Sequence, residues 1–162
     1  MLFLYKTYVR PMLEYNSFIW SPHYVVDIDN IERVQRRFSK SMPGLMNTPY
    51  LERLQTLNID SLEKRRVMAD LVQLFKIING FIDISHDGLF DFNQINTRGH
   101  SLKIRQQSCR LNCRKFSFIP RVIPIWNNLP SCIAETRTVE DFKCKLETIN
   151  LNVYCKGRAH MT

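Results

Sequence analysis

The segment from Asp60 to Gly80 constrains the fold of this chain more than any other. Asp60 can cap the first turn of a helix, and Glu63, three residues on, can return the hydrogen bond, which is the capping-box spacing. Gly80 suits the left-handed position that follows a last helical turn. The later turns are apolar around most of the circumference, at Met68, Leu71, Val72, Leu74, Phe75, Ile77 and Ile78. The pattern predicts a long helix over 60–79, exposed at its charged start and buried at its end.

Two shorter helices are predicted ahead of this one. Asp29 and Glu32 repeat the capping-box spacing, so a helix should begin at Asp29. Its apolar face would consist of Ile31, Val34 and Phe38. Thr48 and Pro49 suit the N-cap and the first position of the next helix, over 50–57. Its buried positions would be Leu51, Leu54 and Leu57, and the three helices together should form one compact unit.

The flanking segments carry weaker patterns. Residues 2–9 are predicted to be helical, with Pro11 kinking or ending the helix. Partly alternating apolar residues predict two strands, one at 102–104 and one at 116–118. The three prolines that follow limit 121–129 to short irregular or helical turns.

A last helix is predicted from the capping signal at Thr138. Asp141 stands three positions on, and the apolar face would consist of Phe142, Leu146 and Ile149. The residues from Leu151 to Thr162 are expected to fray. With 162 residues, of which 44% are hydrophobic, the chain can build the core of one domain, or of a small domain with an appendage.

The positive charge is concentrated in a few segments. Lys and Arg number 23 against 15 Asp and Glu, a formal net charge of +8. No acidic residue lies between Asp91 and Glu135, and this gap contains Arg98, Lys103, Arg105, Arg110, Arg114, Lys115 and Arg121. Such a region attracts polyanions by releasing their counterions. A solvated basic surface without a specific partner explains the charge equally well.

Neither a membrane span nor a signal peptide is expected. No run of about 18 apolar residues occurs, and the opening 1–5 is followed by Lys6 without a basic region ahead of it. The five cysteines are an odd number, typical of free thiols in a reducing compartment. An intracellular location, nuclear or cytoplasmic, is therefore expected.

The sequence offers no recognisable metal centre. Cys109 and Cys113 could be combined with Cys155 and His160, but these pairs are about 40 residues apart and lack knuckle turns. We therefore expect no metal and no cofactor.

Residues for polymerase or nuclease chemistry are also missing. A templated polymerase holds two divalent ions on paired aspartates, and this sequence has no Asp-Asp pair. Asp27 and Asp29 come nearest, but helix capping explains Asp29 better. The cluster Ser85-His86-Asp87 stands beside Gly88, which favours a turn over a nuclease site. We expect no catalytic residue in this chain.

Four segments follow one another in a characteristic order. They are Leu-Tyr-Lys-Thr-Tyr-Val-Arg-Pro-Met-Leu-Glu-Tyr at 4–15, Ile-Glu-Arg-Val-Gln-Arg-Arg-Phe at 31–38, Leu-Glu-Arg-Leu-Gln-Thr-Leu-Asn-Ile-Asp-Ser-Leu-Glu-Lys-Arg-Arg at 51–66 continuing to 80, and Arg-Val-Ile-Pro-Ile-Trp-Asn-Asn-Leu-Pro at 121–130. Together they resemble the C-terminal part of the reverse transcriptase polyprotein of jockey-type, LINE-like non-LTR retrotransposons. The resemblance covers about 2–149.

In that family, this region follows the polymerase palm and forms the thumb and a tail. The resemblance implies a mainly α fold: a helical thumb-like bundle followed by a small α+β tail. The corresponding segments would be a thumb-like region at 1–80, a basic C-terminal subdomain at 81–150 and a frayed tail at 151–162. The chain would be a non-catalytic fragment of an RNA-directed DNA polymerase, with the palm and endonuclease portions of the parent polyprotein as partners.

On this interpretation, basic side chains bind the DNA or RNA backbone, because phosphate contacts need Lys or Arg but little sequence specificity. The candidates are Arg33, Arg36, Arg37, Lys40, Lys64, Arg65, Arg66, Lys103, Arg105, Arg110, Arg114 and Lys115. Trp126, in the segment that resembles the family's Trp-Asn-x-Leu-Pro, could stack on a base, but a core anchor is favoured. The alternatives are a domesticated nucleic-acid-binding or protein-interaction module, or a non-functional remnant of a decayed element.

Overall fold

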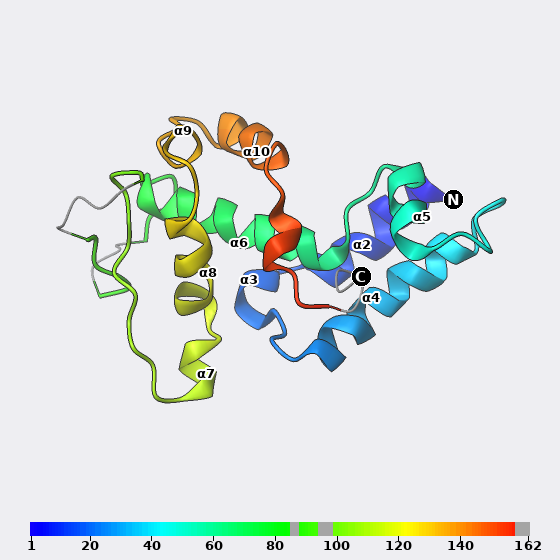
Figure 1. The fold of residues 1–162 in the computed structure, drawn as a ribbon, viewed down its shortest axis with the longest axis horizontal. Helices are drawn as coiled ribbons and strands as arrows, with labels where there is room; N and C mark the ends of the chain where they lie inside the picture. The colour runs from blue at the N-terminus through cyan, green and yellow to red at the C-terminus, as the bar shows by residue number, and fades with distance from the viewer. Residues whose placement is uncertain (85–87, 94–98, 158–162) are drawn as a thin grey trace. The chain divides into compact units, whose positions relative to one another are not determined.

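The computed structural model describes residues 1–84, 88–93 and 99–157. Its fold is mainly α, as predicted (Figure 1). The elements in chain order are α1 (Leu2–Leu4), the π-helical turn η1 (Tyr5–Val9), α2 (Arg10–Glu14), α3 (Ser17–Trp20), α4 (Val25–Lys40), α5 (Tyr50–Leu57), α6 (Leu62–Ile78), α7 (Asn112–Lys115), α8 (Phe118–Asn127), α9 (Ser131–Ala134), α10 (Val139–Glu147) and the 3₁₀ turn η2 (Leu151–Tyr154).

The described residues of the predicted tail lack its β part. In the part of the chain that the structure describes, Phe92 and Ile104 form only an isolated antiparallel bridge, and no strand is present. The strand predicted at 116–118 is wrong, because α8 begins at Phe118 and Pro120 fits its first turn. Short apolar runs do not distinguish a strand from a buried helix by periodicity alone.

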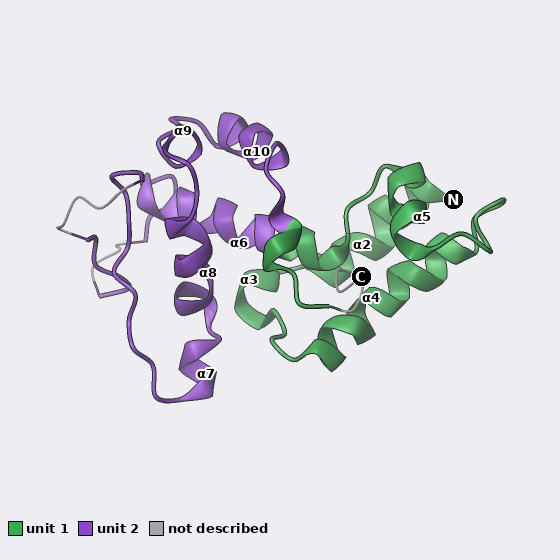
Figure 2. Ribbon diagram, in the orientation of Figure 1, with its two compact units in different colours: residues 1–66, 152–162 green, residues 67–151 purple. Residues whose placement is uncertain are grey.

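The chain forms two compact units (Figure 2). Unit 1 consists of Met1–Arg66 and the C-terminal segment that begins at Asn152, and unit 2 consists of Val67–Leu151. Helix α6 contributes its first turn to unit 1 and its later turns to unit 2. These boundaries differ from the predicted ones, which follow residues 80 and 150. The assignment of a thumb-like region and a tail to the predicted segments stays a prediction.

The N-terminal helical segment of unit 1 continues through Pro11. The Arg10 N–H bonds to the Tyr5 carbonyl, five residues back, in the π-helical turn. This wider turn directly before the proline accommodates a ring that would otherwise clash with the preceding turn. The segment therefore remains helical to Glu14.

Helix α4 begins a full turn earlier than predicted. Its N-cap is Tyr24, which makes no side-chain capping bond, so the capping role predicted for Asp29 is wrong. Asp29 lies inside the helix and forms an ion pair with Arg36 at 3.7 Å. Glu32, its predicted capping partner, is buried and accepts hydrogen bonds from the Tyr50 hydroxyl and the Leu62 N–H.

The bounds predicted for α5 are confirmed, but its cap is displaced by one residue. Pro49, not Thr48, occupies the N-cap position. Of the three leucines expected to be buried, Leu54 is buried, Leu57 is half-buried and Leu51 is exposed.

The end of α6 is as predicted, and its start is not. Gly80 has φ +68°, and the Phe81 N–H bonds to the Lys76 carbonyl at 2.9 Å, closing the C-terminus. At the other end, the Ser61 hydroxyl accepts from the Lys64 N–H at 3.2 Å, so Ser61 takes the role predicted for Asp60.

The charged start of α6 is not exposed as expected: Glu63 and Arg66 are buried, and Lys64 and Arg65 are half-buried. The Glu63 carboxylate accepts the backbone N–H groups of Lys156 and Gly157 at 2.6 and 2.9 Å. The expectation of a frayed tail is therefore wrong for 151–157: Leu151 is a buried residue of unit 2, and 152–157 belong to unit 1.

The core of unit 2 is formed by the apolar half of α6 together with α8 and α10. Phe75 stacks on Phe142 with ring centroids 4.2 Å apart. Trp126 is fully buried, and its indole N–H donates to the Leu102 carbonyl at 2.8 Å. The prediction that Trp126 is a core anchor is confirmed. The predicted Thr138 cap of α10 is also confirmed, because the Thr138 hydroxyl accepts a hydrogen bond from the Asp141 N–H.

Candidate nucleic-acid interface

A row of basic side chains runs along the exposed face of α4. Arg33, Arg37 and Lys40 stand at i, i+4 and i+7, so they share one side of the helix, and all three are exposed. The opposite side carries the buried residues Ile28, Glu32, Gln35 and Ser39. Within the described chain, none of the three cations forms an ion pair. We call Arg33, Arg37 and Lys40 the α4 stripe.

Arg36, on the same helix, interacts with two side chains of its own chain. Besides its ion pair with Asp29, its guanidinium lies 5.1 Å from the centre of the Tyr50 ring. It is half-buried, so it is less available to a ligand than the α4 stripe.

Lys64 and Arg65, two of the cations of α6 predicted to bind nucleic acid, are in ion pairs within the chain. The Lys64 ammonium is 2.6 Å from the Asp60 carboxylate. Arg65 forms a bidentate pair with Glu14, in which Nη2 is 2.9 Å from Oε2 and Nε bonds to Oε1. This hydrogen bonding raises the pKa of Arg65. Each of these two cations is therefore already paired with a carboxylate of unit 1.

Arg66 faces the interior of unit 1 and is only 2% exposed. Burial lowers the pKa of its guanidinium, while the nearby Glu32 and Glu63 oppose that shift. An exposed phosphate cannot reach a side chain in this position. The three α6 cations therefore differ from the α4 stripe in availability, although all were predicted from the same charge pattern.

A buried polar network fixes the position of α4. The Tyr5 hydroxyl donates to Gln35 Oε1 at 2.8 Å, and Gln35 Nε2 donates to the Asp60 carbonyl at 3.0 Å. Burial, reinforced by the charge of Glu32, raises the pKa values of Tyr5 and Tyr50, so both hydroxyls stay protonated as donors. The network holds the side of α4 opposite the α4 stripe.

Unit 2 carries a second set of exposed cations, which we call the unit 2 basic group: Arg105, Arg110, Arg114 and Lys115. Arg114 donates to Gln107 Oε1 at 3.2 Å, and the Lys115 ammonium lies 5.6 Å from the centre of the Phe116 ring. Lys103 is half-buried. Arg98 lies outside the described residues.

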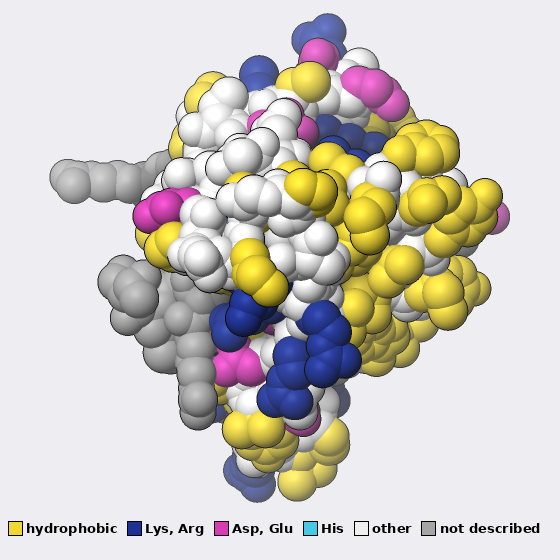
Figure 3. All heavy atoms as spheres, turned by 90° about the vertical axis from the view of Figure 1, so that its right-hand side faces the viewer, with side chains coloured by type: hydrophobic (Ala, Val, Ile, Leu, Met, Phe, Trp, Pro, Cys, Tyr) yellow, Lys and Arg dark blue, Asp and Glu magenta, His cyan; other side chains and the backbone are white. Residues whose placement is uncertain are grey.

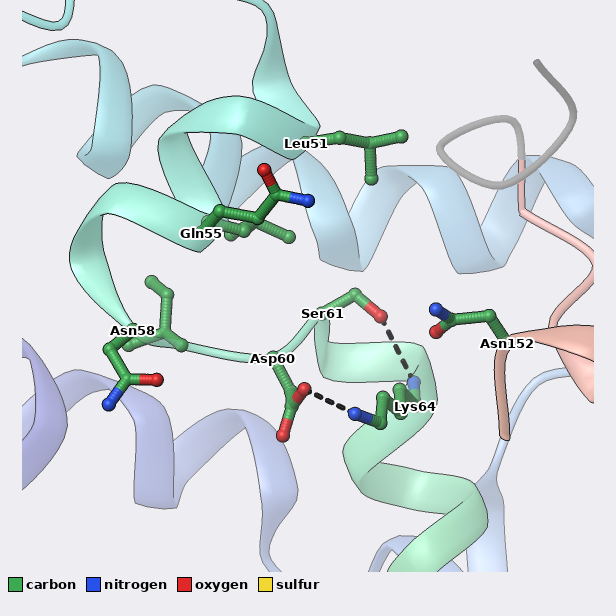
Figure 4. Close-up of a pocket in the computed structure, with 9 residues that line it drawn as sticks. Leu51, Gln55, Asn58, Asp60, Ser61, Lys64 and Asn152 are labelled. Atoms are coloured by element: carbon green, nitrogen blue, oxygen red, sulfur yellow. Dashed lines mark hydrogen bonds and ion pairs between the residues drawn. The ribbon is translucent and has the colours of Figure 1, made fainter. Parts of the chain in front are cut away.

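Unit 1 also contains a pocket of about 430 Å³ that the sequence did not reveal (Figure 4). It is lined by Leu51, Leu54, Gln55, Asn58, Ile59, Asp60, Ser61, Lys64 and Asn152. The amide side chains of Gln55, Asn58 and Asn152 line it, and the Lys64 ammonium is paired with Asp60. The pocket thus offers neutral hydrogen-bonding groups instead of an unpaired cation for a phosphate. The left-handed Asn58, φ 48°, ends α5 beside it, and asparagine tolerates this conformation.

Some residues of the catalytic and metal patterns in the sequence lie outside the described residues. Ser85-His86-Asp87 and His160 are not among the described residues. Over the described ranges, no group of three or more His, Cys, Asp or Glu side chains is arranged to hold a metal ion. Across the same ranges, no helix has both the length and the apolar character needed to cross a membrane.

Comparison of the sequence with protein-family models and with curated proteins finds no match, and comparison with solved structures finds none either.

Proposed function

We propose that this chain is the thumb and post-thumb part of a non-LTR retrotransposon reverse transcriptase, and that it grips the nucleic-acid backbone without taking part in the chemistry. The α4 stripe carries this proposal, because its three cations are exposed, aligned and without an ion pair among the described residues. The resemblance of the four sequence segments to that family supplies the identity. Such a function belongs in the nucleus or the cytoplasm.

The geometry of the stripe suits a phosphate backbone. Seven residues of α-helix rise about 10 Å, so Arg33 and Lys40 span about three steps of one strand at about 3.4 Å each. Backbone contacts of this kind position a duplex without reading its sequence. We expect binding that is weak, indifferent to sequence and strongly dependent on salt.

The salt dependence of binding tests the proposal. Affinity for a labelled DNA or RNA–DNA duplex is measured by fluorescence anisotropy over a range of salt concentrations. The logarithm of the binding constant should fall against log salt with a slope of about −0.9 per phosphate neutralised. The triple variant Arg33→Gln, Arg37→Gln, Lys40→Gln should make this slope shallower by about 2 to 3.

The matched control replaces Arg105, Arg110 and Arg114 by Gln, which removes the same charge from unit 2. If only the control variant loses affinity, the unit 2 basic group is the contact surface and the assignment to α4 is wrong. If neither variant changes the slope, or if duplex does not bind at low salt, the proposal fails.

The same proposal holds that the chain has no polymerase activity of its own, because the Asp-Asp pair is missing from its sequence. Primer extension with Mg²⁺ or Mn²⁺ on natural and homopolymer templates should give no product. Reproducible, dose-dependent extension by the purified chain would contradict it.

A further inference from the structure

The N-terminal helical segment exposes many large apolar side chains. Phe3, Leu4, Tyr8, Val9 and Met12 are all exposed on α1, η1 and α2, and so is Met1, the N-cap of α1. Soluble proteins rarely expose a contiguous apolar patch of this kind unless it binds something. Figure 3 shows a face on which hydrophobic side chains, in yellow, gather over a broad area, with a group of Lys and Arg side chains beside them.

A groove of about 310 Å³ lies within this apolar surface. It is lined by Met1, Leu4, Tyr5, Tyr8, Val9 and Phe38, and we call it the N-terminal groove. Its floor is well defined, because the Tyr5 and Phe38 rings stack with centroids 4.1 Å apart and the Tyr5 hydroxyl bonds to Gln35. The groove is therefore a preformed apolar site between the N-terminal helical segment and α4.

The surroundings of the groove are positively charged. Around the circumference of α4, the exposed Val34 stands between Phe38 and the α4 stripe, so the cations border the groove on that side. Most of the negative charge of unit 1 is already neutralised or buried. Glu14, Asp29 and Asp60 are in ion pairs, and Glu32 and Glu63 are buried, which leaves Asp27 and Glu52 as the exposed acidic residues of this unit outside the ion pairs.

We propose that the N-terminal groove binds an amphipathic helix of a partner protein, whose apolar side chains fill the groove and whose flanking acidic side chains face the α4 stripe. Charge complementarity selects an acidic partner. Leu4, Tyr8 and Met12 recur every fourth residue, and such a row forms a ridge against which a second helix packs.

Other modes of peptide binding fit the groove less well. Addition of a strand needs a sheet edge, and the described residues contain no strand. A proline-rich peptide needs open aromatic slots, whereas Tyr5 and Phe38 stack on each other. A helix is the occupant that these contacts favour.

A helix bound in the groove would affect binding of the nucleic-acid backbone proposed above. Both ligands are negatively charged and both use the α4 stripe. The partner helix and a nucleic-acid duplex should therefore compete for the chain.

The probe is a fluorescein-labelled helical peptide with Leu at i, i+3, i+4 and i+7 and Glu at the flanking positions; a second peptide has Lys in place of Glu. Binding to the full chain is measured by anisotropy. We expect the Glu peptide to bind, the Lys peptide to bind at least about tenfold more weakly, and unlabelled duplex to displace the Glu peptide.

Matched variants distinguish binding in the groove from nonspecific hydrophobic binding. Leu4→Gln and Tyr8→Gln remove side chains that are 56% and 66% exposed, and each should weaken binding about tenfold. Leu111→Gln and Tyr24→Gln change the same residue types at similar exposure, 68% and 60%, and should leave binding unchanged. Circular dichroism of the variants checks that all four remain folded.

Several outcomes would overturn the proposal. One is equal loss of binding in the groove and control variants, and another is equal affinity for the two peptides. Binding to phosphatidylcholine–phosphatidylserine vesicles, lost in Leu4→Gln and without any peptide binding, would assign the surface to a membrane face. A concentration-dependent dimer, measured by sedimentation and lost in Leu4→Gln, would assign it to a second copy of the chain.

Discussion

Arg121 of α8 forms a bidentate ion pair with Asp70 of α6 inside unit 2. Arg121 Nε is 2.9 Å from Asp70 Oδ2 and Nη2 is 3.0 Å from Oδ1, while Nη1 donates to the Phe116 carbonyl at 3.1 Å. Asp70 is buried and Arg121 is half-buried. The pair therefore uses one cation of the acid-free stretch for structure and joins two helices that lie far apart in the sequence.

Removing one partner of this pair should destabilise unit 2 strongly. Asp70→Ala leaves the guanidinium without its carboxylate and should cost about 3–5 kcal/mol of unfolding free energy. The double variant Asp70→Leu, Arg121→Met should cost less than the Asp70→Leu single variant, because neither charge then remains unpaired. Urea unfolding of the variants measures this, and additive losses in the double variant would show that the two residues are not coupled.

The apolar half of α6 should be the most sensitive part of the core. Phe75→Ala removes a fully buried ring that stacks on Phe142 and should cost about 3–5 kcal/mol. Leu71→Asp should cost more, because it places an unpaired charge in the same core. Phe3→Ala, an exposed phenylalanine, is the control. Thermal melts within a degree or two of the parent for both core variants would contradict this burial.

The contact between Glu63 and the C-terminal segment depends on Gly157. A Cβ at this position would lie 2.8 Å from Glu63 Oε2 and 3.0 Å from Ile28 Cγ2. Gly157→Ala should therefore displace the segment and speed hydrogen exchange at the Lys156 and Gly157 amides. Glu63→Ala should do the same and cost about 1–3 kcal/mol, whereas Glu63→Gln keeps one acceptor and should cost less. Unchanged exchange in Gly157→Ala would show that the contact is not needed.

His100 should make unit 2 less stable in acid. Burial lowers the pKa of this histidine, and the charge of Lys103 lowers it further. The hydrogen bond between Nε2 and the Trp126 carbonyl, 3.0 Å long, and the charge of Glu135 oppose this shift without cancelling it. The stabilisation by neutral His100 is complete above about pH 6.5, the pKa of a histidine in the unfolded chain. It is lost as the pH falls toward the lower pKa of His100 in the folded protein. His100→Gln should flatten the pH dependence of the unfolding free energy in this range. A parent protein equally stable above and below this range would contradict the prediction.

Local signals account for the parts of the fold that could be predicted. The cap at Thr138 and the left-handed Gly80 act within one turn of their own helices, and both are found as predicted. The burial of Leu71 and Phe75 follows from a helix that is apolar on most sides. The early start of α4 was missed because Asp29 and Glu32 have capping-box spacing, yet they are used in an ion pair and in buried hydrogen bonds.

The candidate site was predicted only as a set of residue types. The charge pattern treats Arg37 and Arg66 alike, but one is exposed on α4 and the other is buried. The pocket beside Asn58 and the N-terminal groove had no signal in the sequence, because each is assembled from residues of separate elements.

By itself, the sequence determined the helical class, the ends of several helices and the excess of positive charge, since these depend on neighbours within a few residues. Only the tertiary structure decided which cations face solvent. Glu63 is buried by backbone groups 93 and 94 positions away, and Arg65 is paired with a carboxylate 51 positions away. Burial and ion pairing depend on which distant segments meet, and helical periodicity holds no information about that.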